Sequence, residues 1–300
     1  MNAPTKALQL HYKGEHYEKK RLLQAIRQNS IEVVSKVEEI DGHQVHTVEN
    51  GELVFRASET YYPAVYSIQT KREWLDHLYP KAGPKSWWNP WGGGIMTIPR
   101  NLQLRTIMEQ THTVSFVKMN DQWNRQWHGI KISIQFNDHP DYAGAILNQY
   151  YVTLPGATVL AHLIQCEKGP TLLTEKHWLS GSFLNREGLS IYPTASEDEL
   201  YHLRGGQFEL NGQALDSVNR LYANDTDESL VVISQNQVES REFYQNKDVF
   251  AYMTIEKLEK WPHQERVQSQ PQFFVWTEGL PASRGWEWIR DVQLKEDLTD

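Results

Sequence analysis

Apolar and polar residues alternate along most of the chain after residue 30, which is the pattern of strands with one buried face. Residues 31–58 read IEVVSKVEEIDGHQVHTVENGELVFRAS, and the dipeptides Asp41-Gly42 and Asn50-Gly51 interrupt the alternation. Both dipeptides suit the positive-φ positions of tight hairpin turns. This segment is therefore predicted to be a meander of antiparallel strands.

Further strand-like runs, rich in β-branched and aromatic residues, follow at short intervals. They read TVSFVKM, GIKISIQF, QYYVTLP, TVLAHLIQC, LVVISQ, VFAYMTI, QFFVWTE and WEWIRDVQL. Another turn signal, Asn211-Gly212, lies among them. Helical segments that could connect parallel strands are not predicted between these runs, so the pattern favours a mainly β fold, an antiparallel sandwich or barrel.

The segment before the meander has a different spacing of apolar residues. In residues 15–29, EHYEKKRLLQAIRQN, the apolar residues Leu22, Leu23 and Ile26 fall on one side of a helical wheel and the other residues are mostly charged. This spacing predicts an amphipathic helix. The domain organisation that follows is an N-terminal helical extension over 1–30 and one large β domain over 31–300.

Composition narrows the class of protein. The chain has 300 residues, a net charge of -8 and one cysteine, Cys166, in a strand-like run that suggests a buried, inert thiol. The acidic balance does not indicate a surface for nucleic-acid phosphates. An apolar segment of about 20 residues that could span a membrane is absent, and residues 1–20 contain no apolar core of a secretory signal. These features favour a cytoplasmic protein that acts without membrane or nucleic acid.

Aromatic residues are the unusual part of the composition. The chain contains 11 Trp and 14 Tyr, and residues 86–94 read SWWNPWGGG. Flat rings with polar edges suit the C–H faces of sugars, and glycines let another group approach the backbone. A carbohydrate-binding cleft wall containing Trp88 and Trp91 is one interpretation, and an aromatic corner that closes a β-sandwich is the other.

Motifs for nucleotides, zinc or a serine nucleophile do not occur, so no cofactor or metal is predicted. His128 and His177 each stand beside a tryptophan, Trp127 and Trp178, with a glycine nearby. Histidine transfers protons near neutral pH, although a hydrogen-bonded structural histidine is the simpler interpretation of each alone. Further candidates are the possible bases Glu175, Glu256 and Glu278, and Arg100, which could hold a hydroxyl or carboxylate.

The order of these segments resembles the galactose mutarotase-like β-supersandwich over roughly residues 45–295. The resemblance rests on VENGELVFRASETYYPAVYSI, PKSWWNPWGGGI, NQYYVTLPGATVLAHLIQCEKG, LLTEKHW and the closing segment TEGLPASRGWEWIRDVQL. It implies a large antiparallel β-supersandwich with a cleft on a concave sheet face, lined by aromatic, histidine and acidic residues.

The aldose epimerases of that family imply the roles of individual residues. His177 would donate a proton to the ring oxygen, Glu256 would accept the proton of the anomeric hydroxyl, and His128 would orient the sugar. The substrate would be bound by a set of aromatic and cationic side chains: Trp88, Trp91, Arg100, Trp127 and Trp178. The expected activity is a cofactor-independent sugar epimerase or mutarotase that uses general acid–base catalysis.

Three other functions fit the same sequence. A non-catalytic carbohydrate-binding domain would use the aromatic residues alone, and a lyase on the same fold would act on uronic acids. A protein-interaction scaffold would use the N-terminal segment as its contact element. Fold alone does not choose among these functions.

Overall fold

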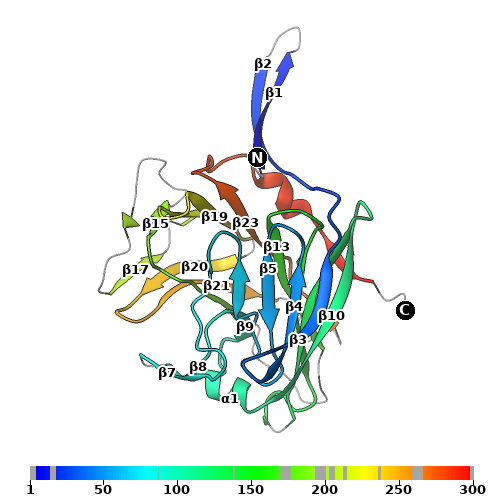
Figure 1. The fold of residues 1–300 in the computed structure, drawn as a ribbon, viewed down its shortest axis with the longest axis vertical. Coiled ribbons are helices and arrows are strands. Elements are labelled where there is room, and N and C mark those ends of the chain that lie inside the picture. The colour runs from blue at the N-terminus through cyan, green and yellow to red at the C-terminus, as the bar shows by residue number, and fades with distance from the viewer. Residues whose placement is uncertain are drawn as a thin grey trace.

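The computed structural model describes most of the chain and is built almost entirely of strands (Figure 1). The described residues are 5–13, 18–86, 88–137, 139–167, 169, 177–192, 201–202, 207–211, 215–235, 238–258 and 266–297. The predicted mainly β class and the antiparallel pairing are confirmed, because every strand pair in these residues is antiparallel.

The largest element of the fold is one eleven-stranded sheet. Its strand order is β16-β15-β18-β19-β23-β13-β12-β11-β10-β24, and β22 also pairs with β13. Its strands are β10 (Thr111–Asp121), β11 (Gln126–Gln135), β12 (Ile146–Thr153), β13 (Val159–Glu167), β15 (Leu189–Tyr192), β16 (Tyr201–His202), β18 (Val218–Ala223), β19 (Glu228–Ile233), β22 (Arg266–Gln268), β23 (Gln272–Glu278) and β24 (Leu294–Glu296). The strand-like runs of the sequence from TVSFVKM to QFFVWTE, except VFAYMTI, form the centre of this sheet.

Two smaller sheets pack on one face of the large one. The four-stranded sheet has the order β3 (Val34–Ile40), β4 (His43–Glu49), β5 (Val54–Ala57) and β6 (Ser67–Gln69). The five-stranded sheet has the order β17 (Phe208–Asn211), β20 (Val238–Gln245), β21 (Phe250–Lys257), β14 (His177–Phe183) and β9 (Ile95–Pro99). A short ribbon of β7 (Gly83–Lys85) and β8 (Trp88–Trp91) and the helix α1 (Leu104–Met108) follow the four-stranded sheet along the chain.

The main core lies between the large sheet and the two smaller ones. Phe55 of the four-stranded sheet and Tyr252 of the five-stranded sheet share one cluster with Ile130 and Tyr151 of the large sheet. Alternate residues of the same central strands, such as Tyr150 and Val152, pack on the other face against Trp286 and Ile289. The central strands of the large sheet are therefore buried on both faces, which explains why β12 and β13 contain no exposed residue.

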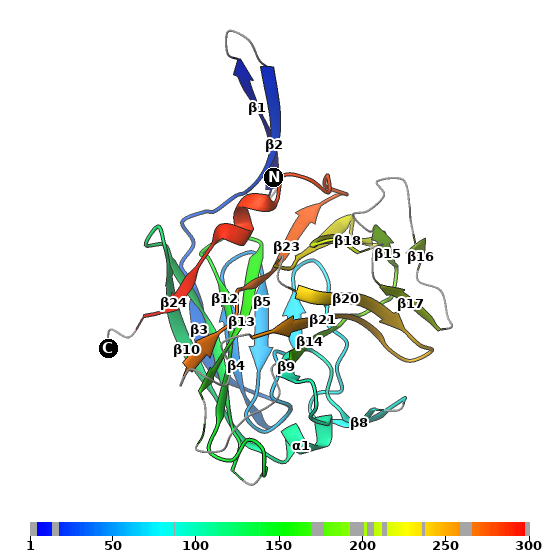
Figure 2. The ribbon, with the colours of Figure 1, turned by 180° about the vertical axis from the view of Figure 1, so that it is seen from behind.

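The N-terminal segment is a β-hairpin and not the predicted helix. Strands β1 (Thr5–Lys13) and β2 (Glu18–Ile26) pair along their whole length, with Leu8 opposite Leu23. The prediction was wrong because it used residues 15–29 alone. The apolar residues of β1, in TKALQLHYK, alternate with polar ones, and pairing with this strand outweighs the helical spacing within β2. The hairpin extends away from the body in both views (Figures 1 and 2).

The C-terminal run WEWIRDVQL also differs from its prediction as a strand. It forms a 3-10 helix over Glu287–Asp291, labelled η2, followed by the short strand β24. Its apolar residues Trp286, Ile289 and Val292 recur every third position and face the large sheet. In the described ranges, no helix is long and apolar enough to cross a membrane.

Candidate functional site

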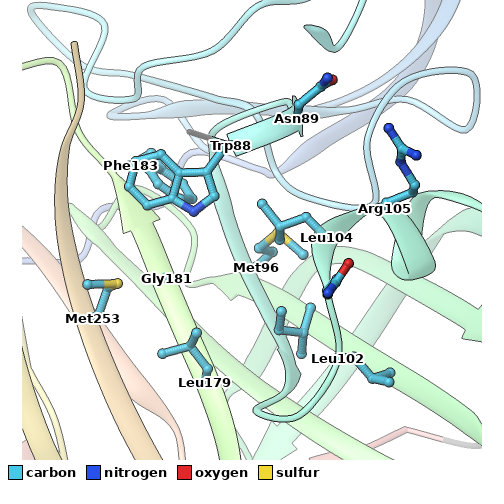
Figure 3. A pocket seen from close by; sticks show the side chains of 12 residues that line it. Trp88, Asn89, Met96, Leu102, Leu104, Arg105, Leu179, Gly181, Phe183 and Met253 are labelled. Carbon is cyan, nitrogen blue, oxygen red and sulfur yellow. The ribbon is translucent and has the colours of Figure 1, made fainter. Parts of the chain in front are cut away.

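A cavity of about 420 Å³ opens on the outer face of the five-stranded sheet, the face turned away from the main core (Figure 3). The sheet supplies its floor, and the β8 strand and the segment leading into α1 supply its walls. The lining residues are Trp88, Asn89, Met96, Ile98, Leu102, Gln103, Leu104, Arg105, Leu179, Gly181, Phe183 and Met253. Its volume lies in the usual range for small-molecule sites.

The floor follows from the two-residue period of strands. Met96 of β9, Gly181 of β14 and Met253 of β21 are cross-strand partners in one row, so their side-chain positions share one face. Ile98 and Leu179 form the next row. Because Gly181 has no side chain, the sheet is hollow between the two methionines, and a Cβ built there meets only Phe183 Cε2 at 3.7 Å.

Trp88 forms an aromatic wall beside this hollow and is held by other rings. Its ring centroid lies 5.6 Å from that of Phe183 and 5.8 Å from that of Tyr244, both edge to face. Trp91 packs behind Phe183 at 5.4 Å and is fully buried, so it supports the wall and does not line the cavity. Of the two predicted stacking residues, Trp88 alone lines the cavity.

A lysine fixes the ribbon that carries Trp88. Lys85 Nζ lies 4.2 Å from the centre of the Trp91 ring and 2.6 and 2.7 Å from the two carboxylate oxygens of Asp76. The tip of the ribbon is tied by Asn246 Nδ2, which donates to Ser86 Oγ at 2.9 Å. The wall is therefore preorganised before any ligand enters.

The glycine run relieves crowding within the protein itself, which agrees with the second of the two interpretations of this segment. Gly93 and Gly94 have φ of 78° and 77°, and a Cβ on either would overlap a backbone carbonyl oxygen, that of Asp76 or Val65. Gly92 packs against the ring of Tyr62 in the same way. The glycines are thus required for close approach of the protein's own backbone, and the approach of a sugar is not what fills this space.

Polar groups are arranged around the rim and not on the floor. Asn89 and Arg105 project away from Met96 and Leu179 (Figure 3). Glu242 of β20 is the cross-strand partner of Met253 and so continues the floor row toward the sheet edge. Burial and the negative charge of Glu209 raise the pKa of Glu242.

His177 lies on the cavity face, two residues before Leu179 on β14. Its Nε2 atom is 3.3 Å from Glu239 Oε2, and both side chains are partly exposed. The backbone N–H of Arg100 donates to the carbonyl of His177 at 2.9 Å. Arg100 is exposed and does not line the cavity.

Glu256 lies on the other face of the same sheet. Its cross-strand partner is Trp178, which is buried in the core, and its side chain joins an inner polar group with Thr97, His162 and Ser180. In that group, Thr97 Oγ1 lies 2.8 Å from His162 Nε2 and 2.6 Å from Ser180 Oγ. Burial lowers the pKa of His162 to about 4. The structure does not bring His177 and Glu256 together.

The remaining predicted site residues lie away from the cavity. Trp178 is a core residue, and Trp127 is buried on the far face of the large sheet, where its Nε1 donates to Asp121 Oδ2 at 3.2 Å. His128 pairs with Thr153 in the large sheet, and burial together with Lys118 lowers its pKa. Cys166 is buried, and this burial raises the pKa of its thiol.

Trp87 and Glu175 lie outside the described residues, as does Gly212 of the third turn signal. Among the side chains that the structure does place, no three of His, Cys, Asp or Glu are grouped to hold a metal ion. Met96, Gly181 and Met253 line the cavity but were not predicted from the sequence. The alternation in GGIMTIP and HWLSGSF, read as two strands of one sheet, was the signal for the first two.

The sequence matches no protein-family model and no curated protein sequence. The fold is similar to that of several solved structures, among them the following three. A TPR-domain containing protein from Parabacteroides distasonis shares a TM-score of 0.55 at 9% identity, over 80% of this chain and 48% of that one. The α-galactosidase from Lactobacillus brevis has a TM-score of 0.51 at 11% identity, over 80% of this chain and 40% of that one.

A candidate aldose 1-epimerase from Klebsiella pneumoniae subsp. pneumoniae gives a TM-score of 0.50 at 8% identity, over 92% of this chain and 91% of that one. The chain thus spans about half or less of the first two proteins and nearly all of the third. At these identities the likeness concerns the fold alone. The chain therefore shares a β fold with these three structures.

Proposed function

We propose that the protein binds a carbohydrate on the outer face of the five-stranded sheet, with one sugar ring in the cavity against Trp88. The observation that carries the proposal is the hollow above Gly181, which has an aromatic wall, a non-polar floor and polar groups only around its rim. A pyranose has the matching distribution, because its C–H face is apolar and its hydroxyls point outward. The fold's likeness to an α-galactosidase and to a candidate aldose 1-epimerase supports this ligand class.

The rim offers both donors and acceptors for hydroxyl groups. Asn89, Gln103 and Arg105 supply N–H donors, and Glu242, which does not itself line the cavity, supplies a carboxyl group beside Met253 on the same face of the sheet. The aromatic wall is fixed by Phe183 and Tyr244, so a sugar ring would stack on Trp88 without ordering it first.

A glycan panel tests this function. Thermal-shift screening with monosaccharides, uronic acids and short oligosaccharides should give at least one stabilising sugar, whose Kd is then measured by calorimetry. Trp88→Ala should weaken the binding of that sugar at least tenfold, which is about 1.4 kcal/mol of binding free energy. The matched control is Trp123→Ala, because Trp123 is 54% exposed in the turn between β10 and β11 and lines no part of the cavity.

Two results would reject the proposal. One is the absence of a stabilising sugar anywhere in the panel. The other is a bound sugar whose Kd responds equally to Trp88→Ala and Trp123→Ala, since stacking in the cavity would then contribute nothing.

A second candidate function is cofactor-independent epimerisation of the bound sugar, with His177 as the proton donor. The observation that favours it is the contact between His177 Nε2 and Glu239 Oε2 on the cavity side of the sheet. A histidine beside a carboxylate is suited to proton transfer, and Glu239 would replace Glu256 as its partner. Polarimetry with the bound sugar should show turnover that falls at least 100-fold in His177→Ala while the Kd stays within a few-fold. A wild-type rate equal to the uncatalysed rate would leave binding as the function.

A further inference from the structure

Exposed apolar side chains gather in two elements far from the cavity. Leu8 and Tyr12 of β1 are 39% and 47% exposed, and Val34 and Val37 of β3 are 51% and 49% exposed. Ile31, just before β3, is 48% exposed. Exposed apolar side chains that gather on one element are typical of surfaces that another chain covers.

The hairpin has too little of its own core to account for its apolar residues. Leu8, Leu10 and Tyr12 alternate along β1 and share one face with Leu23, the partner of Leu8. A two-stranded hairpin alone is marginally stable in water, and a third strand or a packed face is needed to stabilise it.

The base of the hairpin is anchored to the body of the protein. The backbone N–H of Gln24 donates to the carbonyl of Gly285 at 2.8 Å, and Trp288 Nε1 donates to the carbonyl of Gln24 at 2.7 Å. These bonds involve β2, so β1 keeps its outer edge unpaired within the described residues. The hairpin is thereby held in a direction that leads away from the body (Figure 2).

Strand β3 is the complementary element. It is the edge of the four-stranded sheet, and among the residues placed by the structure it pairs only with β4. Its free edge therefore presents unpaired backbone N–H and C=O groups beside Val34 and Val37. Such an edge is a template for strand addition.

The two elements have opposite charge. Residues 5–26 contain five Lys or Arg residues and two Glu, whereas residues 31–41 contain four Asp or Glu residues and one Lys. Two hairpins would repel each other, and so would two β3 edges. Of these three pairings, charge attraction favours the one between a hairpin and a β3 edge.

We propose that β1 of one copy of this chain adds to the free edge of β3 in a second copy and extends its four-stranded sheet. The hairpin of each copy points away from its own body, so the β3 edge that it meets belongs to another copy. The nine residues of β1 are enough to cover the seven of β3. Leu8 and Tyr12 share one face of β1 and are then buried near Val37, because Val34 lies on the opposite face of β3, and the basic side chains of the hairpin lie near the acidic ones of β3.

Light scattering after size-exclusion chromatography and sedimentation velocity test the self-association. The wild-type chain should form dimers or larger oligomers at micromolar concentration, and high salt should weaken them. Val37→Lys should yield monomers with an unchanged circular dichroism spectrum, because the side chain is exposed in the single copy. The control Leu280→Lys changes an equally exposed apolar residue elsewhere and should leave the oligomer intact. A wild-type monomer at all concentrations, or an oligomer indifferent to Val37→Lys, would overturn the proposal.

Cross-linking identifies the pairing itself. A Leu8→Cys chain mixed with a Val37→Cys chain of different mass should give a mixed product with a short bis-maleimide. Cys166 does not interfere, because it is buried. Leu8→Cys mixed with Leu280→Cys is the control and should give no such product. Equal yields in the two mixtures would show that β1 does not lie beside β3.

Discussion

The side chains of His177 and Glu256 project from adjacent strands of one sheet, but on opposite faces of it. His177 is the cross-strand partner of Lys257, whereas Glu256 is the partner of Trp178. Directly opposed residues of antiparallel strands share a face, and successive residues alternate. His177 therefore belongs to the cavity side with Leu179, and Glu256 belongs to the interior side with Thr97 and His162.

This relationship predicts different effects for the two residues. Glu256→Gln keeps the shape of the side chain on the interior side, so it should leave the Kd of the sugar bound against Trp88 within twofold of the wild-type value. Isothermal titration calorimetry measures this, with Glu242→Gln as the matched change on the cavity face, where a loss of a few-fold is expected. A larger loss for Glu256→Gln than for Glu242→Gln would place the ligand on the interior side.

Gly181 offers a graded test of where the ligand lies. The added methyl group of Gly181→Ala meets only Phe183, at ordinary contact distance, so it should be accepted and should stabilise the strand by about 0.5–1 kcal/mol. The side chain of Gly181→Leu enters the hollow between Met96 and Met253 and should weaken sugar binding at least tenfold.

Chemical denaturation and calorimetry on both variants separate stability from binding. A folded Gly181→Leu protein that binds the sugar with the wild-type Kd would contradict the placement of the ligand in this cavity. Loss of binding in Gly181→Ala alone, with an unchanged free energy of unfolding, would mean that the ring contacts the strand backbone itself.

The strands were predictable because their signals are local. The alternation in GIKISIQF gives both the strand and the buried face of β11, and TVSFVKM gives the strand β10 but not its buried face, because Phe116 is 38% exposed. Asp41-Gly42 forms the predicted hairpin turn between β3 and β4. The N-terminal hairpin was not predictable from residues 15–29, because its pairing partner lies in residues 5–13. Helical spacing within one strand cannot reveal a partner outside the window.

The site was only partly predictable because side-chain convergence depends on register. Trp88 was identified from its aromatic segment and does line the cavity. Trp127 and Trp178 have similar local sequence, yet the strand period directs both into buried clusters. Met253 and Gly181 become neighbours only through the pairing of β14 with β21, which no single segment specifies.

The glycine run predicts a strong stability effect that is independent of binding. Gly93→Ala should destabilise the protein by about 2–5 kcal/mol, because the residue has φ of 78° and its Cβ would overlap the carbonyl oxygen of Asp76. Urea denaturation checks this value against Gly181→Ala, which changes a glycine in an open position. A Gly93→Ala protein as stable as the wild type would show that the contact with Asp76 relaxes without cost.

The buried histidine of the inner polar group makes stability depend on pH. His162 is fully buried and stacks on Tyr151 at 4.4 Å, and burial lowers its pKa from 6.5 to about 4. Below pH 6.5 the His162 ring is protonated in the unfolded chain, whereas in the folded chain it stays neutral until about pH 4. The free energy of unfolding therefore falls as the pH is lowered through this window, by about 2 kcal/mol between pH 7.5 and 5 from this residue alone.

Urea denaturation at pH 7.5 and pH 5 measures this decrease in the free energy of unfolding. His46, His77, His112 and His128 also have lowered pKa values and act in the same direction, so the contribution of His162 is obtained by difference. His162→Gln should remove about 2 kcal/mol of the dependence of the free energy of unfolding on pH. If the His162 variant does not fold, the ring can be titrated by NMR in the wild-type protein, where it should stay neutral down to pH 5. Protonation of that ring near pH 6.5 in the folded protein would contradict the explanation.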